Sequence, residues 1–321
     1  MEEIIIGKHE AGQRLDKFLL KYLNRAPSSL IHKFLRKKDI RLNGQRADGS
    51  ELLRSGDSIL IRLPAVQITD LREETRIPAD LRAYPHIDVI YEDADVLILN
   101  KPAGILTQKA SAGDVSLNEE LLAYTLDTGA VTAESLQFFR PSVCNRLDRN
   151  TAGLVLAAKN LPAAKCLNEL IRSRRIGKFY RCLVSGRLDS AQNKEAWLLK
   201  DPGTNTARIL AQEQPGAVRI ETKIYPLSFN EHASLLEIEL ITGKSHQIRA
   251  QLAAMGHPVL GDPKYGLRDE KYGRKKKHAQ ALVACRLVFP QDCGTLAQLN
   301  GKTVTAPLPD WFRKLQEESD L

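Results

Sequence analysis

The sequence predicts an α+β protein with a small N-terminal α/β domain and a larger domain built on a mixed, largely antiparallel sheet. Residues 1–63 carry two amphipathic helical patterns followed by a hairpin signal. The segment 64–84 is polar, charged and weakly periodic, which suits a linker. From residue 85 to 321, short strand-like runs are separated mostly by turns, without the regular alternation of strand and helix that builds a parallel sheet.

The N-terminal part combines an apolar core pattern with a basic surface. Residues 12–23 and 28–39 place apolar side chains at helical spacing and Lys and Arg on other faces. Asn43-Gly44 suits a tight turn, and the run that ends at Pro64 alternates like a strand. This part contains 13 basic and eight acidic residues, a net charge of +5. We therefore expect a compact unit of two helices and a hairpin with a basic face.

The larger part has many strand signals and few helical ones. Strands are expected in the runs DVIYED, DVLILNK, GLVLAAK, FYRCLVSG, VRIETKIYPLSF, SLLEIELITG and ALVACRLVF, all between residues 88 and 289. Helical patterns occur at about 115–126, 161–175 and 245–255. Gly256 and Pro258 are suited to end the last of these helices.

Composition limits the class of protein. The 321 residues include 47 Lys and Arg against 39 Asp and Glu, a formal net charge of +8, and 43% are hydrophobic. This is typical of a globular chain, and no apolar run approaches the ~20 residues of a membrane span. The acidic start MEEIIIG does not resemble a secretory signal. We expect a cytoplasmic protein without a membrane partner, and the basic excess makes a polyanion the first partner to test.

Several common catalytic motifs are absent from the sequence. Gly243-Lys244-Ser245 resembles the end of a phosphate-binding P-loop, but Ile238 stands where that motif requires glycine. No GxGxxG turn, HExxH or GxSxG occurs, and the five cysteines form no CxxC pair. The sequence therefore gives no support to a dinucleotide enzyme, a zinc protease, a serine hydrolase or a structural zinc site.

The segment NRLDRNTAGLVLAAK places an acidic residue, Asp148, between Arg146 and Arg149 ahead of an apolar strand. Cations that close would favour the charged form of the carboxylate if the groups meet in space, which suits a nucleophile better than a general acid. Taken alone, the segment fits an ordinary exposed Arg–Asp pair better.

Four segments together resemble the RluA-type family of RNA pseudouridine synthases over residues 87–315. They are NKPAGILTQ, NRLDRNTAGL, GKFYRCLVSG and ITGKSHQIRAQLAAMGHPVLGDPKYG, in that order. GQRLDKFL and IRLNGQ in the first 63 residues resemble the αL-type RNA-binding domain found in a ribosomal protein and in RNA-modifying enzymes. The resemblance implies the pseudouridine synthase fold for residues 85–321 and RNA as the partner.

The resemblance also implies the site residues. The family's catalytic aspartate, tyrosine and arginine fall on Asp148, Tyr180 and Arg249. We expect support from Arg146, Leu147, Arg149, His246 and Gln247. Pseudouridine formation breaks the bond between ribose and a uracil nitrogen and rejoins the base through carbon, which requires no cofactor and no metal. A monomer is expected.

The residue types suit this chemistry, although some roles stay open. Arg249 could hold the Asp148 carboxylate charged and oriented while Asp148 attacks the ribose carbon or removes a neighbouring proton. Tyr180 could stack on the flipped uracil or help remove the proton from its new attachment carbon. The alternative for Tyr180 is a half-buried strand residue, and for Arg249 a solvated helix residue.

The sequence also departs from the commonest family pattern at positions that could hold the target nucleotide. Asn145 replaces a usual His, Asn150 an acidic residue, Ala152 a hydroxyl residue and Val283 a frequent His. Extruding a uridine from folded RNA costs a few kcal/mol, which backbone contacts must offset. The candidates for those phosphate contacts are Arg14, Lys17, Lys33, Arg36 and Lys37. Arg172, Arg174, Arg175 and the run 274–277 could widen this surface.

The first hypothesis is a pseudouridine synthase that acts on ribosomal RNA or, as a second choice, transfer RNA. The alternative is a non-catalytic, ribosome-associated RNA-binding or assembly factor. An RNA methyltransferase is a weaker third hypothesis, because the glycine-rich cofactor turn after a first strand is missing.

Overall fold

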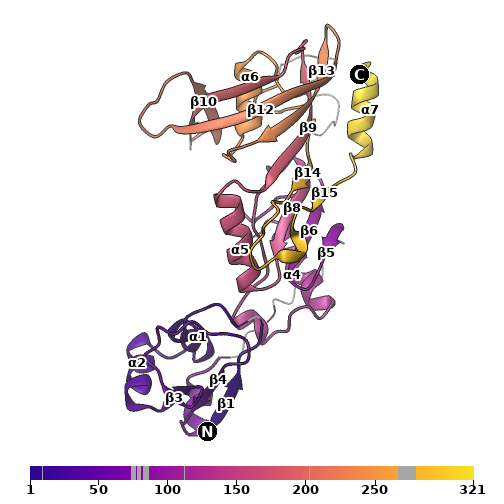
Figure 1. Cartoon of the computed structure of the whole chain (residues 1–321). Helices are drawn as coiled ribbons and strands as arrows, with labels where there is room; N and C mark the ends of the chain where they lie inside the picture. Colours follow the sequence, from indigo (N-terminus) through magenta and orange to yellow (C-terminus); the bar gives the residue numbers. More distant parts are fainter. Residues whose placement is uncertain are drawn as a thin grey trace.

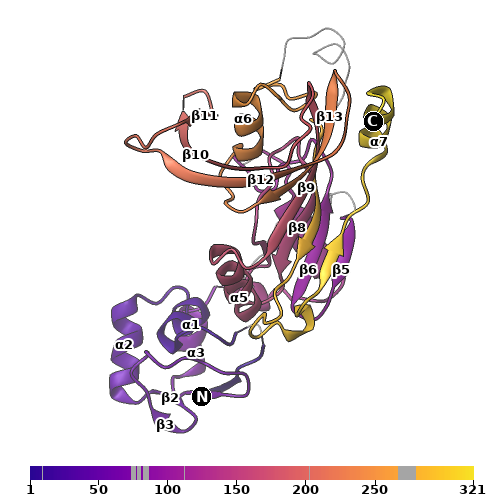
Figure 2. The ribbon, with the colours of Figure 1, turned by 45° about the horizontal axis from the view of Figure 1, so that its top comes forward.

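A computed structural model describes the chain at residues 1–8, 10–73, 77, 81, 87–111, 113–201, 203–266 and 280–321. The N-terminal unit lies at one end of the molecule, and a large sheet extends away from it (Figure 1; Figure 2). Within the described residues, no helix combines the length and the apolar character needed to cross a membrane.

The N-terminal unit is a four-stranded antiparallel sheet covered by helices. Its elements are β1 (Glu2–Ile5), α1 (Leu15–Tyr22), α2 (Ser28–Lys37), β2 (Ile40–Leu42), β3 (Gln45–Arg46) and β4 (Ser58–Ile61), with strand order β1-β4-β2-β3. Asn43 and Gly44 both have positive φ, as the tight turn between β2 and β3 requires. The two expected helices and the hairpin are confirmed.

The beginning of the expected linker is structured. Helix α3 (Ala65–Asp70) follows Pro64, and Ile68 on it is buried in the N-terminal core. Periodicity over so short a helix gives little signal in the sequence. The remainder of 64–84 includes 74–76, 78–80 and 82–84, which lie outside the described residues.

The larger sheet is mixed and mostly antiparallel, as the sequence predicts. Its strands are β5 (Val89–Glu92), β6 (Val96–Lys101), β7 (Ser142–Val143), β8 (Ala152–Ala158), β9 (Gly177–Ser185), β10 (Gln192–Asp201), β11 (Thr206–Leu210), β12 (Val218–Phe229), β13 (Ala233–Leu240), β14 (Leu282–Val288) and β15 (Thr303–Thr305). The order is β11-β10-β12-β13-β9-β14-β8-β6-β5, with β15 paired to β14 and β7 to β8. Among the described strand pairs of this sheet, only β14 with β8 is parallel.

Helices cover both faces of this sheet. They are α4 (Leu117–Asp127), α5 (Leu161–Arg172), α6 (Gln247–Ala254) and α7 (Asp310–Glu318), with short 3-10 turns at Ser135–Gln137 and Ala297–Leu299. Leu97 and Leu99 of β6 pack in one apolar cluster with α4, whereas Val96 and Ile98 pack in another with α5. Because side chains alternate along a strand, α4 and α5 lie on opposite faces of β6 and β8.

Four residues that pair across adjacent strands form a row that ends at Tyr180. Lys101 pairs with Gly153, Gly153 with Ala284, and Ala284 with Tyr180. Paired residues share a face of the sheet, so Lys101 and Tyr180 flank two positions with little or no side chain. A Cβ at Gly153 would meet the Ala284 carbonyl oxygen at 2.1 Å, so only glycine lets β8 and β14 approach this closely.

The N-terminal unit is joined to the larger domain by direct contacts. Phe138 is buried in the N-terminal core, where its ring stacks on Phe18 with centroids 4.7 Å apart. The Lys21 ammonium donates to the Phe138 carbonyl at 2.6 Å. Lys8 pairs with Asp95 at 2.7 Å. Burial of the aromatic ring and these polar contacts stabilise one docked arrangement.

Candidate active site

Asp148 and Arg249 meet although 101 residues separate them in the chain. Arg249 Nη1 donates to Asp148 Oδ2 at 2.7 Å. The arginine side chain is 5% exposed, whereas the Asp148 side chain is 26% exposed. No described residue donates to Asp148 Oδ1. The guanidinium therefore orients one carboxylate oxygen from the buried side and leaves the other available to a ligand.

Asp262 binds Arg249 through guanidinium nitrogens other than the one that donates to Asp148. Arg249 Nε and Nη2 donate to the two oxygens of Asp262 at 2.7 and 2.9 Å, a bidentate pair in which the aspartate side chain is 0% exposed. The backbone N–H groups of Lys264 and Tyr265 also donate to Asp262 Oδ1. Burial opposes both charges, but these hydrogen bonds lower the pKa of Asp262 and raise that of Arg249. Arg249 is thus fixed as a cation.

Tyr180 and Lys101 occupy the two ends of the row beneath Asp148. Burial, together with the nearby Asp148 carboxylate, raises the pKa of Tyr180, whose side chain is almost fully buried on β9. Burial lowers the pKa of Lys101 to about 7, against the attraction of Asp148. Lys101 Nζ donates to the carbonyls of Pro102, Ile105 and Arg149 within 3.0 Å. Lys101 therefore ties the end of β6 to the Asp148 loop.

Three of the expected supporting residues, Leu147, Gln247 and His246, lie around the Asp148–Arg249 pair. The amide and carbonyl of Leu147 both bond to the Thr107 hydroxyl, at 3.1 and 2.7 Å. Gln247 is buried, and its side chain bonds to Thr222 on β12 and Thr242 after β13, which fixes the start of α6. His246 precedes that helix with a φ of 58° and lies with Nε2 3.9 Å from Asp148 Oδ2.

The other two supporting residues do not do what their sequence position suggested. Arg146 and Arg149 are both exposed, and neither makes a described contact with Asp148. Arg149 instead lies 4.0 Å from Asp114. Neighbours along an extended or turning backbone point in different directions, so adjacency in sequence does not bring these charges together. Asp148 is held by Arg249 rather than by the flanking arginines, and the alternative of a solvated Arg249 is wrong.

Two important residues could not be singled out from the sequence. Asp262 and Tyr265 lie in the segment GDPKYG, which contributed to the resemblance without indicating a role for either side chain. Asp262 binds Arg249 of α6 and Tyr265 contacts His246 directly before it, and only the folded chain brings the loop to that helix. The charged loop residue Asp262 is fully buried, which hydropathy would not predict.

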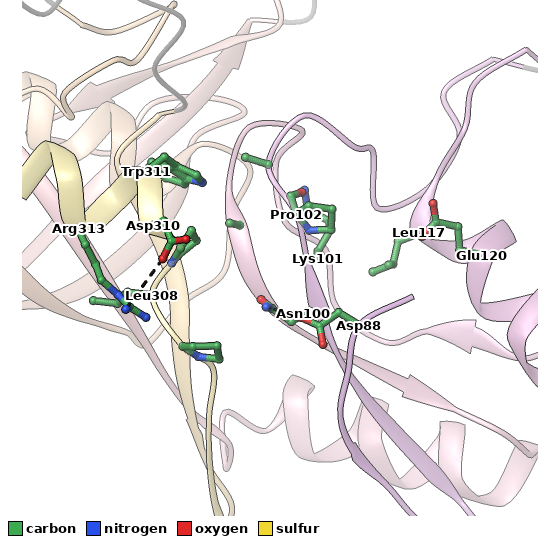
Figure 3. Close-up of a pocket in the computed structure, with 14 residues that line it drawn as sticks. Asp88, Asn100, Lys101, Pro102, Leu117, Glu120, Leu308, Asp310, Trp311 and Arg313 are labelled. Atoms are coloured by element: carbon green, nitrogen blue, oxygen red, sulfur yellow. Dashed lines mark hydrogen bonds and ion pairs between the residues drawn. The ribbon is translucent and has the colours of Figure 1, made fainter. Parts of the chain in front are cut away.

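A cavity of about 670 Å³ lies beside the centre (Figure 3). Lys101 and the start of α4 form one wall and residues 307–313 the other, and none of the three predicted catalytic residues lines it. Its wall includes the carboxyl groups of Asp88, Glu120 and Asp310. The lining also includes the cationic residues Lys101 and Arg313, and Arg313 pairs with Asp310 at 4.0 Å, so the charges of this cavity are mixed.

The described residues contain no group of three or more His, Cys, Asp or Glu side chains arranged to hold a metal ion. The charged groups at the centre satisfy one another: Asp262 accepts from Arg249 and two backbone amides, and Arg249 also donates to Asp148.

The predicted RNA-contacting residues lie on α1 and α2, except Arg14, which directly precedes α1. Lys17, Lys33, Arg36 and Lys37 are exposed and have no ion pair or hydrogen bond with another described residue. Arg14 differs, because its guanidinium pairs with Asp16 at 3.0 Å. On α5, Arg172 pairs with Glu169, and the run 274–277 lies outside the described residues. Four of the five cations are therefore free to meet a polyanion.

The oriented carboxylate of Asp148, the buried Tyr180 and the buried Arg249 are residue types that suit nucleophilic or acid–base chemistry. Comparisons with known proteins specify the class. The sequence profile described as RNA pseudouridylate synthase matches residues 95–254. That range includes Asp148, Tyr180 and Arg249.

Relatives in bacteria match most of the chain. The ribosomal large subunit pseudouridine synthase C of Salmonella typhi is 34% identical over 273 residues, which are 83% of this chain and 80% of that protein. The protein of the same name in Vibrio parahaemolyticus is 33% identical over 82% of this chain and 79% of its own length. In Escherichia coli K12 the corresponding figures are 33%, 83% and 80%.

Solved structures share the fold. Human RNA pseudouridylate synthase domain containing 4 superimposes with a TM-score of 0.58 at 19% identity, over 73% of this chain and 93% of that one. Human RNA pseudouridylate synthase domain containing 1 gives 0.51 at 21% identity, over 76% and 98%. The chain belongs to the RNA pseudouridylate synthase family, as its RluA-type segments predict. It is therefore an isomerase that acts on RNA.

Proposed function

We propose that this enzyme isomerises uridine to pseudouridine in ribosomal RNA, with Asp148, Tyr180 and Arg249 as its catalytic residues. The Arg249–Asp148 contact carries the assignment, because it orients one carboxylate oxygen and leaves the other open. The target RNA is inferred from relatives whose names specify the ribosomal large subunit. Transfer RNA is the second choice.

The reaction needs one charged carboxylate beside the ribose. The bond from the ribose C1′ to uracil N1 breaks, the base turns, and a bond from C1′ to uracil C5 forms. The proton leaves C5 and one proton is gained at N1, so atoms and electrons balance without a redox partner. Asp148 Oδ1 can attack C1′ or remove the adjacent ribose proton, and Arg249 keeps the carboxylate in place through either step.

Tyr180 is better suited to stacking than to acting as a base. Burial raises the pKa of its phenol, and Asp148 strengthens the effect, so the phenolate form is disfavoured. A neutral aromatic ring near the carboxylate can contact a flipped base through the small part of it that is exposed. This favours stacking among the two roles that the residue type allows.

The N-terminal unit supplies the proposed RNA-binding domain. Lys17, Lys33, Arg36 and Lys37 project without intramolecular partners, so neutralising RNA phosphates breaks no ion pair among the described residues. Docking through Phe138 keeps this surface attached to the catalytic domain. Residues 1–63 therefore hold the RNA while residues 85–321 modify it.

Asn145 bears on target choice. Its Oδ1 accepts from the Leu156 backbone N–H at 2.7 Å, so the side chain supports β8 instead of facing a nucleotide. A histidine there could accept this hydrogen bond only through an unprotonated Nδ1, and its ring is larger than the amide. The enzyme is therefore expected to hold the neighbours of its target uridine differently from relatives with histidine at this position.

Release of tritium from carbon 5 of uracil tests the proposal. Purified protein is incubated with labelled ribosomal RNA and, separately, with labelled transfer RNA. We expect release from ribosomal RNA that disappears with Asp148→Asn and persists with Asp189→Asn, an exposed aspartate used as the matched control. Binding without release from either RNA would instead favour the non-catalytic assembly factor. Release only from transfer RNA would correct the substrate.

A further inference from the structure

A single loop holds two residues of the α6 entrance. Asp262 binds Arg249, and Tyr265, three residues later, contacts His246. The Tyr265 hydroxyl lies 3.0 Å from His246 Nδ1, and the two rings meet edge to face with centroids 5.7 Å apart. The Arg249 guanidinium also lies over the Tyr265 ring, 5.2 Å from its centroid. Tyr265 thus combines a hydrogen-bond contact and an edge-to-face ring contact with His246 and a cation–π contact with Arg249.

The hydrogen bonds of Tyr265 determine where its proton goes. The backbone N–H of Ala207 donates to the Tyr265 hydroxyl oxygen at 2.6 Å. An amide N–H can only donate, so the phenolic hydrogen is left for another acceptor. His246 Nδ1 is the described acceptor within reach. If Nδ1 accepts, a neutral imidazole must carry its hydrogen on Nε2.

We propose that Tyr265 is a positioning residue that fixes His246 as its Nε2–H tautomer and so presents a neutral N–H donor beside Asp148. This role rests on the proposed function, because the donor is useful only to a nucleotide bound at Asp148. Nε2 lies 3.9 Å from Asp148 Oδ2, too far for a hydrogen bond between them. The N–H is therefore free for an acceptor oxygen of the nucleotide.

The surroundings of His246 are compatible with a neutral ring. Asp148 and Asp262 attract a proton to the imidazole, whereas Arg249 and Lys264 repel it. Burial is the largest influence and lowers the pKa of His246. The pKa of Tyr265 is raised, again chiefly by burial, so the phenol keeps the hydrogen that it donates.

The tautomer can be measured without RNA. In protein labelled with ¹⁵N in its seven histidines, the His246 resonance is assigned by its disappearance in His246→Gln. We expect Nδ1 to resonate as an unprotonated nitrogen and Nε2 as a protonated one in the wild type. Tyr265→Phe removes the phenol but keeps a ring under Arg249, and the tautomer preference should be lost. A wild-type His246 protonated at Nδ1, or one unaffected by Tyr265→Phe, overturns the proposal.

Activity gives a second, separable readout. Tyr265→Phe should lower kcat for tritium release about fivefold at pH 7, with KM for RNA unchanged, since one hydrogen bond is worth about 1 kcal/mol and ~1.4 kcal/mol corresponds to a factor of ten. Removing the phenol destabilises neutral imidazole, so the acidic limb of the kcat profile should move to higher pH. Tyr225→Phe, on an exposed tyrosine of β12, is the matched control.

The His246 tautomer and tritium release together distinguish a failure of the proposed function from a failure of the role proposed for Tyr265. Wild-type protein that shows the expected tautomer but releases no tritium contradicts the proposed function and leaves the hydrogen-bond assignment standing. If the wild-type protein is active but Tyr265→Phe changes neither the pH profile of kcat nor the tautomer of His246, only the positioning role is contradicted.

Discussion

Arg249 and Arg36 are the same residue type on two helices, one in each part of the chain. The whole Arg249 residue is 4% exposed, and its guanidinium donates hydrogen bonds to Asp262 and Asp148. Arg36 is exposed on α2 and contacts no other described charge. The buried guanidinium fixes a geometry that salt hardly affects, whereas the exposed one is available to a polyanion and is screened by salt. The comparison separates residues that build the site from residues that attract its substrate.

Breaking the buried pair should have the largest effect. Asp262→Asn removes the charge that balances Arg249 while keeping the shape of the side chain. An uncompensated buried charge costs about 3–5 kcal/mol, so the free energy of unfolding should fall by that order. Urea unfolding measures it, with Asp310→Asn on the surface of α7 as the control. A loss below about 1 kcal/mol would mean that Arg249 does not depend on Asp262.

The junction between the two parts should come next. Phe138→Ala empties a buried ring position and should destabilise the N-terminal unit by about 3 kcal/mol. Both tryptophans, Trp197 and Trp311, lie in the larger domain, so their fluorescence reports that domain alone. The circular dichroism transition should therefore broaden or split while the fluorescence midpoint stays. Phe229→Ala, on an exposed β12 residue, should change neither, and coincident shifts of both signals in Phe138→Ala would contradict the separation.

Lys101 should give the site a pH-dependent stability. Its pKa is about 7 in the folded protein and ~10.4 in an unfolded chain. Between these values the unfolded chain binds more protons, so the free energy of unfolding rises with pH, by at most ~1.4 kcal/mol per pH unit. Below pH 7 the contribution levels off. Lys101→Met should remove this slope, and Lys314→Met on α7 should keep it.

A wild-type slope unchanged by Lys101→Met between pH 7.5 and 9.5 would contradict the low pKa. The Lys101→Met variant should also lose part of its tritium-release activity, because the carbonyl of Arg149, next to Asp148, loses its ammonium donor. Unfolding curves in urea at several pH values provide the slopes.

Removing exposed charges should affect stability least. The triple variant Lys33→Gln, Arg36→Gln and Lys37→Gln should stay within about 0.5 kcal/mol of wild-type stability. RNA affinity should fall, and the slope of log affinity against log salt should shrink by about 0.7–0.9 for each lost phosphate contact. Arg172→Gln, which removes a cation paired with Glu169, should have little effect on that slope. An unchanged slope in the triple variant would place the RNA elsewhere.

Local patterns were sufficient for many elements but not for all. The continuous apolar runs of β6 and β8 and the amphipathic faces of α1 and α2 predict those elements directly. The strand β10 was not predicted, because its charged sequence QNKEAWLLKD has little apolar alternation and it depends on pairing with β11 and β12. Tertiary pairing decides such a strand more than propensity does.

The site shows the same division. The resemblance located Asp148, Tyr180 and Arg249 and offered Arg249 as a holder of the carboxylate, whereas the local pattern suggested Arg146 and Arg149. The partner is instead on a helix about 100 residues later. The roles of Asp262 and Tyr265 depend on a loop folding back onto α6, a long-range contact that no periodicity encodes.

One measurement tests most directly whether the two sets of charges have separate roles. Tritium release is followed in a single turnover, with enzyme in large excess over ribosomal RNA, for wild type, Asp148→Asn and the triple variant of α2. We expect no release by Asp148→Asn at any enzyme concentration and wild-type release by the triple variant once the RNA is saturated. Release by Asp148→Asn, or a slow triple variant at saturation, would contradict it.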